Sequence, residues 1–372
     1  APMLSLQINQ TQSRGEQVRE DSVYKWTQDR FPVTIKVDAR GAELDEIRLY
    51  NNGKLIAAEK YGENIQFRGG GKEVKHFDVP LQDGENHISA VVVNASKSES
   101  APVEVIVRYD GTAGGTDLFL FSVGVNSYKN PQYDLKYAVN DAKSFAAAIK
   151  SGSQGLFQSV KEFSLSNKEA TREKLLQTLE LIRKEIGPED VFVFYFAGHG
   201  TMSVERDVAK AEFFLVLHEV INLYDASEIL AKKAFSASEL KEWSVKLSAQ
   251  KQLFVLDACH SGGAVDQLAS RGDGREKAIA QLARSTGTFF LTASQDAQFA
   301  NEAGQLNHGL FTFALLEVLQ GKTNDRDGKV MVNELRIHAE ERVPELAEKM
   351  RGSAQYPVSY SFGQDFPVVM LK

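Results

Sequence analysis

The sequence predicts an α/β protein of two domains, in which a mostly parallel sheet between layers of helices follows a small all-β sandwich. Three observations favour this fold class. The chain has 372 residues, which is long enough for two domains. Its first part contains short β-branched runs separated by turn signals, as antiparallel sandwiches do. After residue 117, apolar runs alternate with amphipathic segments, which is typical of a parallel sheet covered on both faces.

The sandwich is predicted to span residues 31–111, after a polar and unpatterned extension or linker at residues 1–30. Asn52 and Gly53 favour a tight primed turn within it. A glycine-rich hinge at 110–117 then leads into the second domain, residues 117–372. The strands expected in the sandwich are 31–38, 46–54, 75–81, 87–95 and 101–110.

The second domain is predicted to alternate buried strands with helices. Apolar residues recur every three or four positions from Thr171 to Ile186, which indicates an amphipathic helix. Ser236 followed by Glu239 is a capping box that begins another helix, and two more are expected at 308–321 and 333–350. The expected strands are 118–125, 191–198, 213–218, 252–258 and 288–294.

Composition excludes several functions. The net charge is -7, with 43 Lys and Arg against 50 Asp and Glu, so a nucleic-acid partner is not expected. No apolar stretch approaches the roughly 18 residues of a membrane span. The single cysteine, Cys259, allows no internal disulfide and no cysteine-rich zinc site. Because no signal peptide is visible, a cytoplasmic location is expected unless such a peptide has been removed.

Two strand ends carry residues suited to thiol chemistry. The run VFVFYFAGHG (191–200) ends in a turn that holds His199 between Gly198 and Gly200, and Cys259 follows a later apolar run, in LFVLDACHSGG. Catalysts collect beyond the carboxyl ends of parallel strands, so both residues are expected at one edge. Singly, such a cysteine is usually a small buried residue and such a histidine only satisfies a hydrogen bond. Together they predict a thiolate nucleophile and its base.

These residues lie in segments that resemble a known family. YFAGHG (195–200) and DACHSGG (257–263) resemble the histidine and cysteine boxes of caspase-like peptidases, specifically the bacterial branch close to metacaspases. The histidine precedes the cysteine by sixty residues, in the spacing class of caspases. Residues 123–149 are similar to the family's opening strand and first helix, and 287–302 with 308–321 resemble its small-subunit half. The likeness covers about residues 117–372, and the preceding sandwich is expected to be immunoglobulin-like.

The resemblance implies a cysteine endopeptidase that acts on proteins or peptides through a thioester. Cys259 would attack the scissile carbonyl while His199 manages the proton passed to the leaving amine. The backbone N–H groups of Gly200 and Cys259 are the natural donors to the oxyanion. No third catalytic Asn or Asp is evident in the sequence.

Acidic residues predict cleavage after arginine or lysine. Asp257 lies two residues before the nucleophile, and alternate side chains of a strand face the same way. Asp141 in AVNDAK matches a second acidic substrate-binding residue of metacaspase-like relatives, and Asp296 is a third candidate. The alternative for Asp141 is a solvated carboxylate at a helix start, and Asp296 is as readily a surface residue.

No cofactor is implied, although one segment approximates a calcium loop. Asp325, Asp327, Gly328 and Glu334 would occupy its ligand positions, but Thr323 replaces the first aspartate. A polar turn that caps the next helix is the favoured interpretation.

A charged, glycine-containing segment at 264–285 separates the two halves of the second domain, as exposed cleavage sites do. Arg271, Arg275 and Lys277 within it are candidate autoprocessing positions, and the alternative is a plain surface loop.

Three other functions compete with proteolysis. The chain could be a catalytically silent scaffold or signalling module that binds partners through its sandwich. It could use its thiol for acyl transfer or redox sensing, but a sensor usually needs a resolving cysteine. The sandwich could also recognise an unknown protein partner while the protease acts only as its effector.

Overall fold

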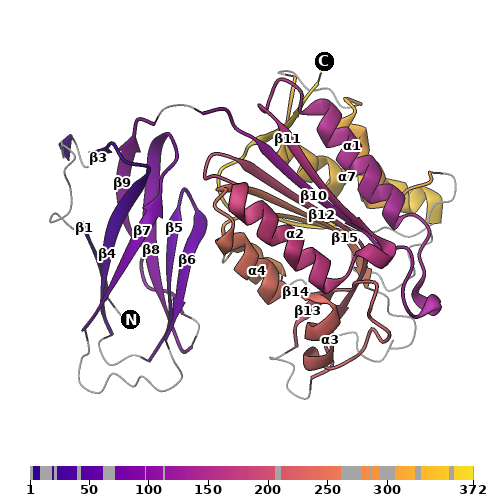
Figure 1. Cartoon of the computed structure of the whole chain (residues 1–372), viewed down its shortest axis with the longest axis horizontal. Helices are drawn as coiled ribbons and strands as arrows, with labels where there is room; N and C mark the ends of the chain where they lie inside the picture. Colours follow the sequence, from indigo (N-terminus) through magenta and orange to yellow (C-terminus); the bar gives the residue numbers. More distant parts are fainter. Residues whose placement is uncertain are drawn as a thin grey trace. The chain divides into compact units, whose positions relative to one another are not determined.

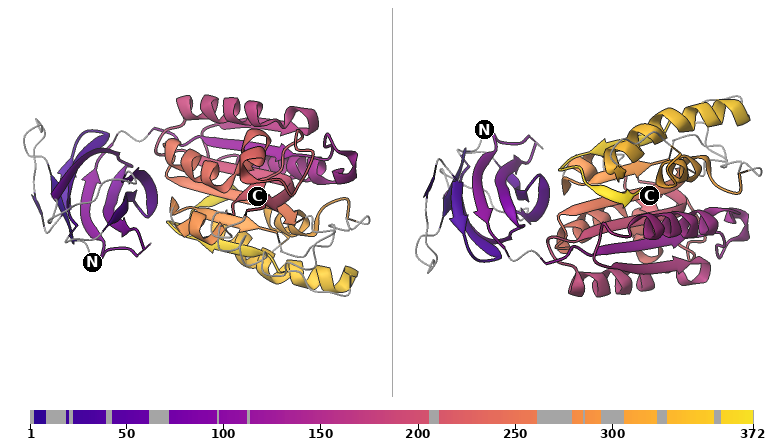
Figure 2. Two further views of the ribbon diagram at one scale, coloured as in Figure 1. Left: turned by 90° about the horizontal axis from the view of Figure 1, so that it is seen from below. Right: turned by 90° about the horizontal axis from the view of Figure 1, so that it is seen from above.

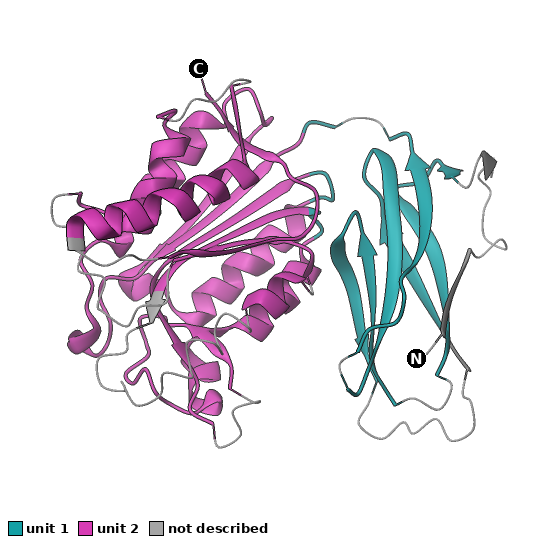
Figure 3. Ribbon diagram, turned by 180° about the vertical axis from the view of Figure 1, so that it is seen from behind, with its two compact units in different colours: residues 1–115, 187–189, 248–250 teal, residues 116–186, 190–247, 251–372 magenta. Residues whose placement is uncertain are grey.

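The computed structural model describes most of the chain, in segments. These are residues 3–8, 19–20, 23–39, 43–61, 72–96, 98–111, 114–205, 211–260, 279–284, 286–293, 306–322, 328–351 and 356–371. The chain forms two compact units (Figure 3). Unit 1 comprises residues 1–115, 187–189 and 248–250, and unit 2 comprises residues 116–186, 190–247 and 251–372.

Unit 1 contains two β-sheets that share one apolar core. The core includes Phe31, Val33 and Ile35 of one sheet with Leu49 and Ile88 of the other. The three-stranded sheet has the order β1(Met3–Ile8), β4(Arg30–Asp38), β7(Lys72–Pro80). The six-stranded sheet has the order β2(Arg19–Glu20), β3(Val23–Trp26), β9(Val103–Tyr109), β8(Gly84–Asn94), β5(Leu44–Asn51), β6(Lys54–Lys60).

The predicted extension at residues 1–30 is wrong for its described parts. Strand β1 pairs antiparallel with β4, and β3 pairs parallel with β9, so both belong to the sheets of unit 1. Trp26 at the end of β3 is buried and its ring packs edge-on against Phe31 at 5.0 Å between centroids. The polarity of the segment hid these strands because only one face of each needs to be apolar.

The predicted turn at Asn52 and Gly53 joins β5 to β6. Both residues adopt left-handed backbone conformations, with φ of 50° and 84°, as a primed hairpin turn requires. The run predicted as one strand at 46–54 is therefore a strand, the turn and the start of the next strand.

Unit 2 is built on one mostly parallel sheet, which confirms the predicted fold class. Its path has the order β11(Val160–Ser166), β10(Leu118–Gly124), β12(Val191–Met202), β15(Lys251–His260), β16(Phe289–Thr292), β18(Val358–Ser361). Neighbours along this path are parallel except β18, which is antiparallel to β16. The short strands β13(Phe213–Leu215) and β14(Phe235–Ser236) extend the sheet beside the end of β12.

Helices cover both faces of this sheet. Helices α1(Ala138–Gly152) and α7(Val332–Arg351) lie over one face, and α2(Arg172–Glu185) and α4(Ala237–Lys246) lie over the other (Figure 1 and Figure 2). The predicted capping box begins α4, where Ser236 and Glu239 each bond the other's backbone N–H. The remaining elements of unit 2 are η1(Pro131–Tyr133), η2(Asn167–Glu169), α3(Ser227–Lys233), α6(Leu310–Leu319), β17(Lys329–Met331) and β19(Pro367–Met370). Among the described helices, none combines the length and hydropathy of a membrane-crossing helix.

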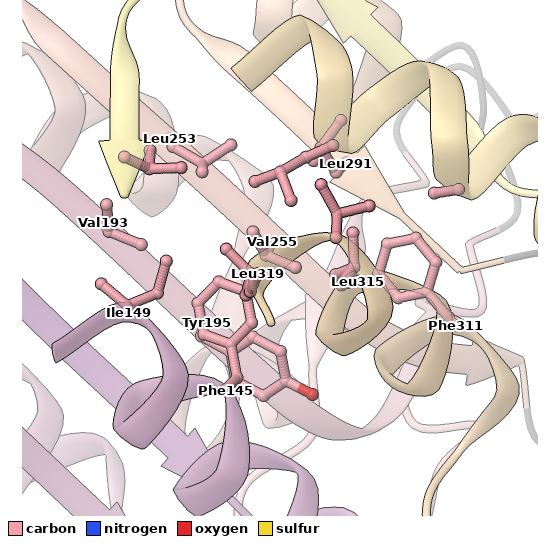
Figure 4. Close-up of a cluster of buried hydrophobic side chains, with 14 of the residues drawn as sticks. Phe145, Ile149, Val193, Tyr195, Leu253, Val255, Leu291, Phe311, Leu315 and Leu319 are labelled. Carbon is pink, nitrogen blue, oxygen red and sulfur yellow. The ribbon is translucent and has the colours of Figure 1, made fainter. Parts of the chain in front are cut away.

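The core beneath α1 and α6 positions the centre of the sheet. Figure 4 shows Tyr195 of β12 and Val255 of β15 packed with Phe145 of α1 and Leu315 of α6. The rings of Tyr195 and Phe145 stack with centroids 4.5 Å apart. Residues at every second position of β12 face this core, while Phe192 contacts Phe254 on the other side. Burial on both faces explains why the strand is apolar without alternation.

Candidate active site

The strands that carry the predicted nucleophile and base lie side by side. In the parallel pairing of β12 with β15, the backbone of His199 lies opposite that of Cys259, and Ala197 lies opposite Asp257. Neighbouring strands of a sheet are about 4.8 Å apart, so this register brings the two backbones together. The structure describes the backbone of Cys259 but not its side chain.

The predicted glycine turn around His199 is wrong. Strand β12 continues to Met202 because its last residues pair with β13. Strand β15 continues to His260, which pairs with Gly200 of β12. Neither Gly198 nor Gly200 has a left-handed backbone. The reason for glycine is space: a Cβ on Gly198 would lie 2.9 Å from the hydroxyl of Tyr128, and one on Gly200 would lie 2.8 Å from the ring of Phe213.

His199 is buried between two tyrosines. Its Nε2 lies 2.8 Å from the carbonyl oxygen of Tyr133, and its backbone N–H donates to the hydroxyl of Tyr128 at 2.9 Å. The ring of Tyr128 lies 5.1 Å from the imidazole between centroids, and that of Tyr133 lies 6.2 Å away. Burial lowers the pKa of His199, while the bond to the Tyr133 carbonyl opposes this by raising it. The imidazole is therefore neutral at neutral pH.

A hydrogen-bonded loop after β10 holds these tyrosines in place. The side chain of Asn167, whose φ is 49°, accepts the backbone N–H groups of Asn126 and Ser127 at 2.9 and 3.0 Å. Asp134 accepts the backbone N–H of Tyr128 at 2.8 Å. The loop thus has little freedom to move relative to His199, although it has no regular secondary structure apart from η1.

Asp141, in the first turn of α1, is buried rather than solvated. One of its carboxylate oxygens lies 2.7 Å from Nδ1 of His308, and the other accepts the backbone N–H of Gly309 at 3.1 Å. Only 3% of the residue is exposed, so the alternative of a solvated carboxylate is wrong. Burial raises the pKa of Asp141, whereas the bonds from His308 and Gly309 lower it.

Asp257 of β15 converges on the same point as Asp141. A Cβ built on Gly309 would lie 3.2 Å from Oδ2 of Asp257 and 3.3 Å from Oδ2 of Asp141. Thr312 donates to Asp257 at 2.5 Å, and the hydroxyl of Tyr195 lies 2.5 Å from that of Thr312. We call Asp141 and Asp257 the acidic pair.

The comparison with protein families concerns most of the second unit. The family model described as the caspase domain, of peptidase family C14, matches residues 121–366. This chain belongs to the caspase domain family. The match confirms the resemblance predicted from the histidine and cysteine boxes.

Two metacaspases are similar to parts of this chain. Metacaspase-1 of Schizosaccharomyces pombe is 27% identical over 150 residues, which are 39% of this chain and 34% of that protein. Metacaspase-1A of Aspergillus oryzae is 22% identical over 177 residues, which are 46% of this chain and 40% of that protein. The matches thus span less than half the length of either relative. The chain is also similar to a crystal structure of a protein from Geobacter sulfurreducens. The match covers 69% of this chain and 100% of that chain, with 17% sequence identity and a TM-score of 0.47.

Several predicted site residues of the caspase domain lie outside the described residues. These are Asp296, the candidate cleavage positions Arg271, Arg275 and Lys277, and the calcium-loop candidates Asp325 and Asp327. Glu334 is described, and its carboxylate accepts the backbone N–H of Met331 at 2.7 Å, at the start of α7. Among the described residues, no three His, Cys, Asp or Glu side chains are grouped to hold a metal ion.

Sequence reasoning missed four contributors to this region of the caspase domain. The backbone carbonyl of Tyr133 could not be singled out from the sequence, because every residue has a backbone carbonyl. Tyr128 lies in a segment that matched the family, but nothing in the sequence ties its hydroxyl to His199. His308 and Thr312 flank the start of α6, and their partners Asp141 and Asp257 are distant in sequence.

Proposed function

We propose that this caspase domain is a cysteine endopeptidase that cleaves protein or peptide substrates after arginine or lysine. Cys259 is the nucleophile and His199 is its proton-transfer partner. The observation that carries the proposal is the register of β12 and β15, which sets His199 opposite Cys259. Facing residues of neighbouring parallel strands project to the same side of a sheet, as a Cys–His pair requires.

The surroundings of His199 support its role as the base. With Nε2–H donated to the carbonyl of Tyr133, the lone pair of the imidazole is on Nδ1, which takes up the thiol proton. A buried, neutral imidazole accepts this proton without first losing one. The Tyr133 carbonyl then stabilises the imidazolium.

The reaction follows from these roles. The sulfur of Cys259 bonds to the scissile carbonyl carbon, and the resulting oxyanion is stabilised by the backbone N–H groups of Gly200 and Cys259. When the C–N bond breaks, His199 passes the proton to the leaving amine and a thioester remains. Water then attacks the thioester, releasing the acid and restoring the thiol.

The acidic pair supports basic specificity. Asp141 and Asp257 converge near Gly309, and Asp257 lies two residues before the nucleophile. A guanidinium or ammonium group before the scissile bond would offset the repulsion between these two carboxylates. A substrate carboxylate would add to that repulsion.

Autoprocessing within 264–285 is part of this proposal. Arg271, Arg275 and Lys277 are basic residues in this segment that the acidic pair would accept. Prolonged incubation of the active enzyme is expected to yield two fragments with new ends after one of these residues. A single intact band would contradict autoprocessing alone.

The test uses two fluorogenic peptides that differ only in Arg or Asp before the reporter. Wild-type protein and Cys259→Ala are compared, and an arginine chloromethyl ketone probes the thiol by mass spectrometry. The proposal predicts cleavage of the Arg peptide by wild type only, and one adduct on Cys259. Equal cleavage by Cys259→Ala, or no cleavage and no adduct, would contradict it; the latter result would favour a silent scaffold.

A further inference from the structure

We infer that His308 is a positioning residue for the acidic pair: it holds the carboxylate of Asp141 in the orientation that receives the substrate's basic side chain. This inference rests on the proposed function, whose specificity it explains. His308 lies in the segment just before α6, and neither the family resemblance nor the peptide-bond chemistry assigns it a role.

Two bonds from neighbouring residues fix the rotation of the Asp141 carboxylate. Nδ1 of His308 lies 2.7 Å from Oδ1, and the backbone N–H of Gly309 donates to Oδ2 at 3.1 Å. With both oxygens held, Oδ2 faces the position near Gly309 on which Asp257 also converges. Asn140 fastens the same segment to α1, because its side-chain amide donates to the carbonyl of Asn307 at 2.9 Å.

His308 also affects the protonation of Asp141. Asp141 is packed near Asp257 on β15 and Tyr195 on β12. Burial raises the pKa of the Tyr195 hydroxyl most, and both carboxylates raise it further. Burial favours the protonated form of Asp141, and the bond from His308 opposes it. Without that bond, Asp141 would take up a proton at a higher pH and attract a cation less. The side chain of His308 is 18% exposed and that of Asp141 is 5% exposed, so the imidazole lies on the solvent side of this bond.

The test is a double-mutant cycle on the full chain, measured with an Arg peptide and its neutral citrulline counterpart. His308→Leu removes the donor, and His308→Asn places an amide N–H close to where Nδ1 lies. We expect His308→Leu to raise KM for the Arg peptide roughly tenfold with little change in kcat, and His308→Asn to restore it. Combined with Asp141→Asn, His308→Leu should change KM by less than about twofold. The citrulline KM should not follow this pattern.

The dependence of KM on pH provides a second readout. In His308→Leu, KM for the Arg peptide should begin to rise at a higher pH than in wild type as the solution is acidified. If His308→Leu does not fold, His308→Asn is compared with His308→Gln, whose longer side chain carries its amide past Asp141. Asn should then retain the wild-type KM and Gln should lose it.

Two results would overturn the inference. One is an equal effect of His308→Leu with and without Asp141→Asn, or on both peptides, since a merely structural role predicts this. The other is an unchanged KM in His308→Leu or His308→Gln. If wild type prefers the Arg peptide in these experiments, the proposed function stands and only the role of His308 fails. If wild type cleaves neither peptide, the proposed function fails first.

Discussion

His199 and Asp141 of the acidic pair are both buried, but burial has opposite consequences for the roles proposed for them. Burial lowers the pKa of His199 and raises that of Asp141, so in both cases it favours the neutral form. At His199 a single carbonyl opposes burial, and the imidazole stays neutral. At Asp141 two N–H donors oppose burial, and a second carboxylate lies near. Burial therefore favours the neutral imidazole that a base needs. At Asp141 it disfavours the negative charge that would attract a basic substrate side chain.

The two regions also differ in what holds them. His199 is held by a backbone carbonyl and by a tyrosine hydroxyl within a bonded loop. The side chains of His308 and Thr312 bond the acidic pair, together with the backbone N–H of Gly309. Substitutions can therefore change specificity more readily than they can change the setting of the base.

The largest effect is expected at the base. His199→Ala should lower kcat about 10²- to 10⁴-fold with little change in KM, because proton transfer is lost while the acidic pair is intact. Steady-state kinetics with the Arg peptide measures both constants. A comparable rise in KM would show that the two regions are not separable, and a kcat within a few-fold of wild type would remove His199 from the mechanism.

The next largest effect is expected in the acidic pair. Asp257→Asn should lower kcat/KM for the Arg peptide roughly 10²-fold, because one charge facing a desolvated cation is lost. The citrulline peptide should be cleaved almost as before. Equal losses for both peptides would mean that Asp257 supports the strand and does not read the charge of the substrate.

A smaller effect is expected beside His199 from added volume. Gly198→Ala should destabilise the protein by about 1–3 kcal/mol, because the new methyl group would lie 2.9 Å from the Tyr128 hydroxyl and 3.0 Å from the ring of Phe196. Gly114→Ala is the matched control, since a Cβ there meets nothing within 4 Å. Urea unfolding of both variants checks this, and equal midpoints would contradict the close packing.

The smallest effect concerns stability against pH. The pKa of His199 is lower in the folded than in the unfolded protein, so the unfolded state binds the proton first as pH falls. The free energy of unfolding should therefore decrease below the ordinary histidine pKa of 6.5. His199→Gln should show less of this decrease in parallel denaturant titrations. Identical curves would mean that the imidazole is not held neutral by burial.

The sequence predicted those parts of the site whose causes are local. The apolar runs of β12 and β15 follow from burial on both faces, and the small residues after them marked the positions of His199 and Cys259. The continuation of β12 past His199 depends on β13, a strand that no local pattern links to it. The bond of His308 to Asp141 joins residues 167 positions apart, so no local pattern could reveal it. Strands β1 and β3 were missed because their segment is polar and their partners, β4 and β9, lie elsewhere in the sequence.

The most direct test of the account compares kcat/KM of the wild-type protein for two peptides that differ only in arginine or citrulline before the scissile bond. The two side chains have nearly the same shape, so the comparison isolates charge. Attraction between the guanidinium of the substrate and the acidic pair predicts a preference for arginine of roughly 10²-fold or more. Equal rates for the two peptides would contradict the assignment of Asp141 and Asp257 to the substrate's basic side chain.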